Sequence, residues 1–326
     1  MKDLESYDSE GVYKQIEEDV KEVLANSEKY SNIPICVLSH LYDKKRSKFI
    51  VDLVKQLEAK QTINREIFVF VYEDQKDRYE FLSKFEEVKM IFMVPDEFNS
   101  TLVGKRNYII NFAKENGYEN IFMIEDDCNN YFLPTLGATN SGVEKNKKHN
   151  LCFNSAFLVW EYCIKKFDLK MSAPLIESSF IWVVTPFKNN ETVRRGYSCI
   201  QNIHLNVKFM SDHDLKYDEN SGWEDFDMNL QFTVNKSLPS LIPMGYSTIA
   251  LKAGLSTIEN NNLQLRCERN SNKFVNKWGY PLSKLVNRKG LTNARIDWIR
   301  IKKQIKEGVD LKKLIKHNVV DEFFKD

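Results

Sequence analysis

Three consecutive acids follow a short apolar run near the middle of the chain. Asn120–Ile124 reads NIFMI, and the triplet Glu125–Asp127 (EDD) comes directly after it. Carboxylates at the end of a buried strand repel one another and are costly to remove from water. Hard oxygen ligands of this kind suit Mg²⁺ or Mn²⁺, which protein sites hold through one or two carboxylates plus substrate phosphates. We therefore expect a divalent metal there; a polar turn that caps a helix is the alternative.

A second acidic cluster, Gly222–Asp227 (GWEDFD), begins at a glycine. Trp223–Val234 has the apolar spacing of a helix, which would place Glu224 and Asp225 in its first turn, near the positive end of the helix dipole. A carboxylate held there can act as a general base toward a hydroxyl. Capping of the helix is the alternative, and the upstream triplet makes capping alone less favoured.

Two cations precede the acidic triplet. Lys105 and Arg106 belong to the run GKRN at the start of a helix that we predict over Leu102–Asn116. A Lys–Arg pair at this place could neutralise a diphosphate or hold the acidic turn in shape. An exposed basic helix start is the alternative.

The elements that position these residues alternate between strand and helix patterns. Short apolar runs rich in β-branched and aromatic residues predict buried strands at Ile33–Leu38, Glu66–Tyr72, Met90–Val94 and Asn120–Ile124. Amphipathic stretches separate them, so we expect an α/β fold with right-handed βαβ units. Ligands on such sheets bind at the carboxyl ends of the strands, where the acidic triplet lies.

Charge is concentrated toward the C-terminus. The segment 262–316 has 15 Lys and Arg against 4 Asp and Glu, a net charge of +11, although the whole chain carries only +1. This asymmetry favours contact with a polyanion; a solvated face of a lysine-rich protein is the alternative. Within the C-terminal region, we predict a polar loop over Glu259–Asn276 and a helix over Arg295–Phe324.

Composition excludes several classes of protein. The 326 residues are 42% hydrophobic, enough for a packed core, and no apolar run approaches the 18 residues of a membrane span. The acidic start is unlike a secretory signal, and six scattered cysteines without a CxxC pair favour reduced thiols. We therefore expect a cytoplasmic protein. The GxGxxG, GxxxxGK[ST] and GxSxG motifs are absent, which argues against dinucleotide, P-loop and nucleophile-elbow sites.

Together, GKRN at 104–107, EDD at 125–127 and the later pair Glu224–Asp225 resemble nucleotide-sugar glycosyltransferases of the GT-A fold. The resemblance covers residues 33–235. It implies an α/β, Rossmann-like fold with a mostly parallel central sheet and flanking helices, to which this chain adds a helical basic C-terminal region. The implied domains are an N-terminal helix (1–30), a catalytic domain (31–258, with a nucleotide-sugar half 31–130 and an acceptor half 131–258) and the basic C-terminal region (259–326).

On the donor side, the resemblance implies that Asp127 holds Mn²⁺ or Mg²⁺ bridging the diphosphate of a nucleotide sugar, for which a UDP-sugar is expected. Asp126 or Glu125 would contact the ribose or a water on the metal, and Lys105 or Arg106 would stabilise the departing diphosphate. Many GT-A enzymes add a C-terminal His to the metal. The histidine that follows the second acidic cluster here is His317.

The resemblance also implies where the nucleoside and the acceptor bind. Ser39 and His40, after the first predicted strand, would begin the nucleotide pocket, and Glu73, after the second, would contact the base. Asp225, beside Glu224, would deprotonate the acceptor hydroxyl in an inverting transfer of a hexose or pentose.

Further runs look similar to bacteriophage enzymes that glycosylate hydroxymethylated pyrimidines in DNA: QN at 201–202, YD at 217–218, EDFD at 224–227 and NKWG at 276–279. This likeness implies 5-hydroxymethylcytosine or hydroxymethyluracil in DNA as the acceptor, and the host cytoplasm as the location if a phage encodes the chain. The alternatives are a GT-A enzyme acting on a bacterial surface glycan and an inactive GT-A-like module that binds nucleic acid or protein.

Overall fold

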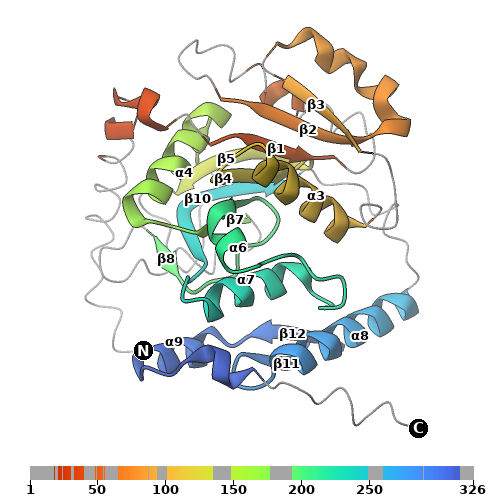
Figure 1. The fold of residues 1–326 in the computed structure, drawn as a ribbon, viewed down its shortest axis with the longest axis vertical. Coiled ribbons are helices and arrows are strands. Elements are labelled where there is room, and N and C mark those ends of the chain that lie inside the picture. Colours follow the sequence, from red (N-terminus) through yellow and green to blue (C-terminus); the bar gives the residue numbers. More distant parts are fainter. Residues whose placement is uncertain are drawn as a thin grey trace.

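The structure is a computed structural model that describes residues 18, 21–23, 25–30, 33–39, 48, 50–53, 55, 65–86, 88–93, 101–134, 148–176, 193–248, 260–288 and 290–315. One large sheet forms its centre, and helices cover both faces of that sheet (Figure 1). Most of the predicted N-terminal helix lies outside the described residues, as do His40 and His317.

The central sheet runs in the order β3-β2-β1-β4-β9-β7-β10-β5-β6, with β8 beside β10. Its strands are β1 (Ile35–Leu38), β2 (Ile67–Tyr72), β3 (Val88–Met93), β4 (Asn120–Glu125), β5 (Cys128–Pro134), β6 (Lys148–Leu151), β7 (Met171–Ile176), β8 (Arg194–Arg195), β9 (Ile203–Asn206) and β10 (Ser240–Thr248). The first four strands pair in parallel, whereas β9, β5 and β8 run against their neighbours. The predicted α/β class with a mostly parallel sheet is confirmed.

The strand register brings the predicted donor residues to one edge. Leu38 at the end of β1 pairs with Phe70 of β2 and with Glu125 at the end of β4. The segments that follow β1, β2 and β4 therefore leave the sheet at the same edge. All four strands predicted from apolar runs begin and end within two residues of the predicted bounds.

Side chains of the buried strands alternate between two hydrophobic cores, as the period of a strand requires. Val69 of β2 belongs to the core beneath α4 (Phe153–Phe167), and the neighbouring Phe70 belongs to the opposite core. The helices α3 (Leu102–Glu115), α6 (Val207–Asp212) and α7 (Glu224–Val234) cover that opposite face (Figure 1). Short 3₁₀ helices, η1 (Ser27–Tyr30) and η2 (Glu73–Lys84), complete this part.

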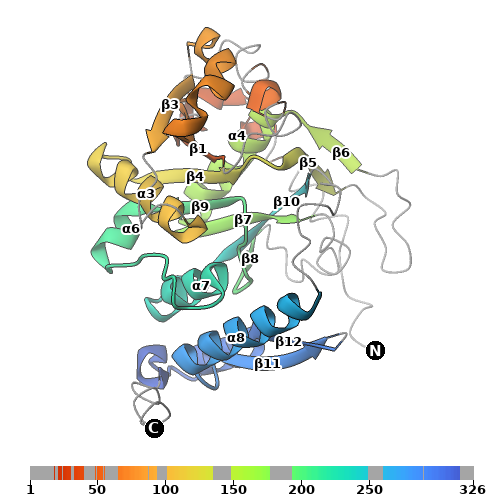
Figure 2. The same cartoon turned by 90° about the vertical axis from the view of Figure 1, so that its right-hand side faces the viewer.

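The C-terminal part forms a further layer beneath α7 (Figure 2). It consists of α8 (Asn260–Trp278), a hairpin of β11 (Ser283–Arg288) and β12 (Leu291–Ile296), α9 (Trp298–Lys306) and η3 (Leu311–Leu314). A third core joins this layer to α7, where Leu230 packs with Phe274 of α8 and Ile301 of α9. The C-terminal part is therefore packed onto the main sheet domain through α7.

The loop predicted over Glu259–Asn276 is wrong, because these residues lie largely in α8. Their asparagine-rich composition conceals an amphipathic helix whose buried side includes Cys267, Ser271 and Phe274. The helix predicted over Arg295–Phe324 is confirmed only for α9 and η3, since residues 295–296 close the hairpin and residues beyond 315 lie outside the described part.

Two further expectations concern the whole chain. In the described part, no helix is long and apolar enough to cross a membrane. All six cysteines are free thiols, and Cys152 alone of them is more than slightly exposed. The domain boundaries at residues 30, 130 and 258 stay predictions.

Candidate active site

The side chains that follow β1 and β4 meet at the carboxyl edge of the sheet. The hydroxyl of Ser39 donates to Oδ2 of Asp126 at 2.5 Å, and the phenol of Tyr79, from η2, lies 2.5 Å from the same hydroxyl. Ser39 and Asp126 are each 2% exposed. Asp126 is therefore held inside the edge by these two hydroxyls, whereas its neighbours Glu125 and Asp127 are less buried.

Arg106 connects the two acidic clusters. Thr101 caps the start of α3 by accepting from the backbone nitrogen of Gly104, which places Arg106 in an early turn facing the sheet. Its Nη2 lies 3.0 Å from Glu125, and its Nη1 lies 2.5 Å from Asp225 and 3.5 Å from Glu224. The guanidinium therefore holds the two acidic segments together, which is the second of the two roles considered for the basic pair.

Burial and mutual repulsion set the charge state of these acids. Burial lowers the pKa of Arg106, but Asp225, Glu125 and Glu224 outweigh that effect, so the guanidinium stays charged. Burial raises the pKa of Glu125 to about 7, helped by Asp225 and Asp127 and opposed by Arg106. The pKa of Glu224 is also raised, first by burial and then by Asp225. Protons can therefore reside on this cluster near neutral pH.

Lys105, the residue before Arg106, lies beside the ends of β1 and β2. Its ammonium is fully buried, 3.3 Å from the backbone oxygen of Ser39 and 3.7 Å from the centre of the Tyr72 ring. Burial lowers its pKa to about 8, although Asp126 and Asp74 act in the opposite sense. A cation fixed beside the ends of β1 and β2 is suited to an anionic ligand at this edge.

The remaining predicted donor residues are less enclosed. Asp127 is half-buried in the turn after β4, and Glu73 is exposed at the start of η2. Glu73 therefore lies at the end of β2 as predicted, on the same edge as Ser39. His40 lies outside the described residues.

The carboxylates at this edge could bind a divalent cation through one protein ligand, Asp127. Five carboxyl groups, on residues 125–127 and 224–225, lie near this edge, and the buried cations among the described residues there are Lys105 and Arg106, so the carboxyl groups outnumber the buried cations. Within the described ranges, no three His, Cys, Asp or Glu side chains gather as ligands of one metal. A cation beside Asp127 would therefore complete its shell with donor phosphates and water, as Mg²⁺ commonly does.

Two asparagines that were not predicted as site residues stabilise the site. The amide of Asn107 bonds both the backbone nitrogen and the backbone oxygen of Tyr217, each at 2.9 Å, and the Tyr217 ring lies 5.1 Å from the Arg106 guanidinium. Asn229 of α7 holds the backbone of Cys199 at 2.8 and 2.7 Å. Asn107 was within the GKRN motif, but nothing in the sequence indicated its partner 110 residues away.

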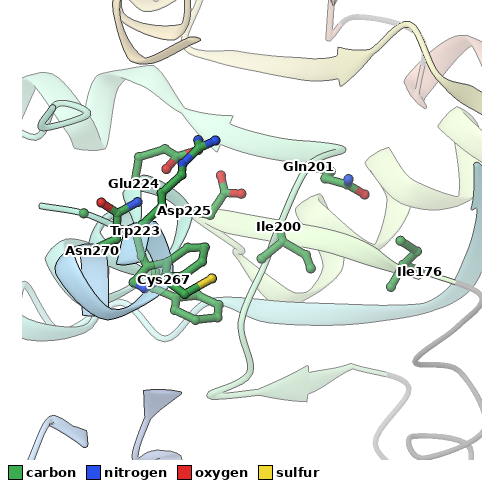
Figure 3. A pocket seen from close by; sticks show the side chains of 11 residues that line it. Ile176, Ile200, Gln201, Trp223, Glu224, Asp225, Cys267 and Asn270 are labelled. Carbon is green, nitrogen blue, oxygen red and sulfur yellow. The ribbon is translucent and has the colours of Figure 1, made fainter. Parts of the chain in front are cut away.

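A pocket of about 430 Å³ opens beside the second acidic cluster (Figure 3). Its walls come from β7, the segment before β9, the start of α7 and the middle of α8. The lining residues are Ile176, Ile200, Gln201, Gly222, Trp223, Glu224, Asp225, Phe226, Arg266, Cys267 and Asn270. The residues from α8 were not predicted as site residues, because their segment was interpreted as a loop outside the catalytic domain.

Gly222 allows α8 to approach the site closely. Its φ is +81°, and a Cβ at this position would lie 2.2 Å from the backbone oxygen of Asn270. Both the left-handed backbone and the lack of space require glycine here. The start of α7 and the wall formed by α8 are therefore seated directly against each other.

Asp227, the last acid of the second cluster, has a structural role. Its carboxylate is fully buried and accepts from Trp278 Nε1 at 2.7 Å and from Gln231 Nε2 at 2.6 Å. Lys277 lies 2.8 Å from Asp227 and 2.7 Å from Asp218. These contacts fix the end of α8 to α7 and to the loop before it.

Comparisons with known proteins identify one family. Residues 38–239 match the family described as TET-associated glycosyltransferase. No curated protein matches the chain.

Three solved structures show weak likeness. They are a mannosyltransferase from Pyrobaculum calidifontis in complex with GDP-Man and Mn²⁺ (8% identity, TM-score 0.43, 75% of this chain and 66% of that chain), a mycobacterial protein (9%, 0.46, 85% and 87%) and 4-diphosphocytidyl-2C-methyl-D-erythritol synthase from Anaerococcus prevotii (10%, 0.36, 73% and 96%). The match spans slightly less than two thirds of the mannosyltransferase.

Proposed function

Because the chain belongs to the TET-associated glycosyltransferase family, we propose that it transfers a sugar from a nucleotide-sugar donor to the hydroxyl of a hydroxymethylated pyrimidine in DNA. The family match confirms the glycosyltransferase resemblance drawn from the acidic motifs. The observation that carries the proposal is the contact of Arg106 with both acidic clusters, since it brings a donor edge and a candidate base into one site.

The donor is proposed to lie along the carboxyl ends of β1, β2 and β4. Ser39 would border the nucleoside, His40 and Glu73 would complete that side, and Lys105 would face the diphosphate. The buried ammonium of Lys105 supports this placement, because its charge is fixed where phosphate would stabilise it. A UDP-sugar remains the proposed donor.

Asp127 is proposed to hold Mn²⁺ or Mg²⁺ together with the donor diphosphate, and Asp126 or Glu125 to contact the ribose or a metal-bound water. When bound, the ion would supply positive charge to the leaving diphosphate. The excess of carboxylates over buried cations at this edge supports a cation there.

In the proposed reaction, Asp225 accepts the proton of the acceptor hydroxyl. The acceptor oxygen forms a bond to the anomeric carbon as the bond from that carbon to the diphosphate oxygen breaks, and the electron pair leaves with the nucleoside diphosphate. Attack opposite the leaving group inverts the anomeric centre. Arg106 orients the Asp225 carboxylate, and Glu224, whose pKa is raised by burial, is a second group that can hold a proton beside it.

DNA with a hydroxymethylated base is proposed as the acceptor because the family's description, TET-associated glycosyltransferase, agrees with the acceptor expected from the sequence. The basic C-terminal region would contact the phosphates. Some of its positive charges are neutralised by ion pairs within the protein: Lys277 pairs with Asp218 and Asp227, and Lys284 pairs with Asp297. Exposed cations such as Lys306 and Lys313 remain at the surface of this layer.

Two variants separate donor binding from transfer. Asp127→Ala should weaken binding of the nucleotide sugar in the presence of Mn²⁺, measured by calorimetry. Asp225→Asn should keep donor affinity near that of the wild type and lose transfer to hydroxymethylcytosine DNA, measured by mass spectrometry of the digested DNA. Full transfer by Asp225→Asn would reject Asp225 as the base, and unchanged donor binding by Asp127→Ala would reject the metal role.

A panel of acceptors tests the rival functions. A surface-glycan transferase would glycosylate a saccharide and leave hydroxymethylcytosine DNA unmodified. An inactive binding module would neither hydrolyse nor transfer any nucleotide sugar with Mn²⁺ present. Either result would overturn the proposed acceptor.

A further inference from the structure

The pocket beside Asp225 has walls that the proposed donor site does not share. The residues that line it come from β7, the segment around Gln201, the start of α7 and α8, and they include none of the proposed donor residues at the ends of β1 and β2. Figure 3 shows the Asp225 carboxylate projecting between Glu224 and Gln201. A molecule in this pocket would therefore meet the candidate base from the acceptor side.

One wall of the pocket is aromatic and apolar. Trp223 is half-buried, and its indole nitrogen donates to the hydroxyl of Ser271 on α8 at 3.1 Å, which fixes the orientation of the ring. Phe226 lies beside it, with ring centroids 6.3 Å apart, and packs against Phe274 of α8 at 6.0 Å. A rigid aromatic surface of this kind is suited to stacking on a planar ligand.

Two amide side chains also line the pocket. The phenol of Tyr246 donates to Oε1 of Gln201 at 2.6 Å, so the amide NH₂ of Gln201 is the group oriented to donate. Gln201 also has a positive φ of 60°, a conformation that non-glycine residues adopt mainly where surrounding structure imposes it. Asn270 adds a second amide from α8 (Figure 3). Amides held in this way can read the hydrogen-bonding edge of a base.

Arg266 adds a cation to this rim. Its side chain is exposed, lines the pocket and lies near enough to Glu224 to act on its pKa, which burial and Asp225 raise while Arg106 and Arg266 act in the opposite sense. Arg269, one turn further along α8, is also exposed but does not line the pocket. Both arginines are therefore exposed to solvent, but only Arg266 places its positive charge at the pocket.

From this arrangement, we infer that the pocket binds one pyrimidine nucleotide of the acceptor, with its base against Trp223 and its phosphate on Arg266. The inference rests on the proposed function and adds to it that α8, beyond the part of the chain that matches the family, forms the acceptor wall. A volume of about 430 Å³ is within the usual range for a small ligand and is far too small for a duplex. A base read here must therefore be a free nucleotide or one that has left its helix.

The nucleotide has two possible sources, and one set of acceptors distinguishes them. Transfer is measured to 5-hydroxymethyl-dCMP, to its nucleoside without phosphate, and to duplexes that place the modified base opposite guanine or opposite a mismatch. If the base must leave the helix, the mismatched duplex should be the better acceptor, because extrusion from it costs less. Transfer to the monophosphate alone would indicate a free nucleotide as the source.

Arg266→Ala and Arg269→Ala form the matched pair. On the acceptor that the wild type uses, Arg266→Ala should raise KM by roughly tenfold or more through loss of a charge-assisted hydrogen bond. Arg269→Ala should change KM by much less, and Arg266→Lys should recover part of the loss. Because the nucleoside has no phosphate for Arg266 to bind, Arg266→Ala and Arg269→Ala should have the same KM for it.

The outcomes separate this inference from the proposed function. Equal effects of the two alanine variants on every phosphate-bearing acceptor would overturn the inference and leave the proposed function intact. Donor hydrolysis by the wild type without transfer to any hydroxymethylated pyrimidine would overturn the acceptor and the inference together.

Discussion

The close contact between Gly222 and α8 gives a prediction whose size can be worked out. In the variant Gly222→Ala, a residue with a Cβ must adopt a φ of +81°, which costs about 1–2 kcal/mol. The new Cβ would also meet the backbone oxygen of Asn270 at 2.2 Å, and relieving such overpacking costs about 1–3 kcal/mol. We therefore expect the free energy of unfolding to fall by about 2–5 kcal/mol.

Gly117 supplies a matched control. It follows α3 with a φ of +74°, and a Cβ there would have nothing within 4 Å, so Gly117→Ala should cost only the backbone part, about 1–2 kcal/mol. Both variants are compared by urea unfolding followed by circular dichroism and by tryptophan fluorescence, which reports on Trp223 beside the contact. Equal destabilisation by the two substitutions would show that α8 is not seated against the start of α7.

Three further predictions concern the charges around the site. Arg106→Met should destabilise the fold by about 3–5 kcal/mol, because it leaves three carboxylates without their shared cation; a loss under 1 kcal/mol in urea unfolding would contradict the role given to it. Glu125→Gln should remove part of the pH dependence of the free energy of unfolding. Burial raises the pKa of Glu125 from 4.5 to about 7. The contribution of Glu125 to stability is therefore fully present below pH 4.5 and is lost as pH rises through 7. The wild type should therefore lose stability relative to Glu125→Gln across that interval, and parallel profiles would refute the shift. Lys277→Met should cost about 1–2 kcal/mol, because Lys277 is one-third exposed and Asp227 keeps its bonds from Trp278 and Gln231; increased proteolysis within α8 is the accompanying readout.

The sequence predicted the donor half of the fold well because strands buried on both faces leave continuous apolar runs. Ile67–Tyr72 is such a run, and every residue in it is buried. The acids after Ile124 were equally visible, because charged residues that follow a buried strand stand out from their surroundings.

The partners of these residues could not be predicted in the same way. Arg106 on α3 and Asp225 on α7 are 119 residues apart, and they meet only in the folded chain. The helix α8 was missed because polar and asparagine-rich positions outnumber the few apolar ones, and the side it buries becomes recognisable only against the hairpin and α7. Asp227 could not be told from its neighbour Asp225 by residue type, although one is fully buried against Trp278 and the other faces the pocket.

The guanidinium of Arg106 has a consequence for the order of events on the protein. One of its nitrogens contacts Glu125, on the proposed donor side, and the other contacts Asp225, on the proposed acceptor side. A ligand that binds Glu125 would change how strongly Arg106 attracts Asp225. With donor and acceptor bound as proposed, we expect each to alter the affinity for the other, because thermodynamic linkage is reciprocal.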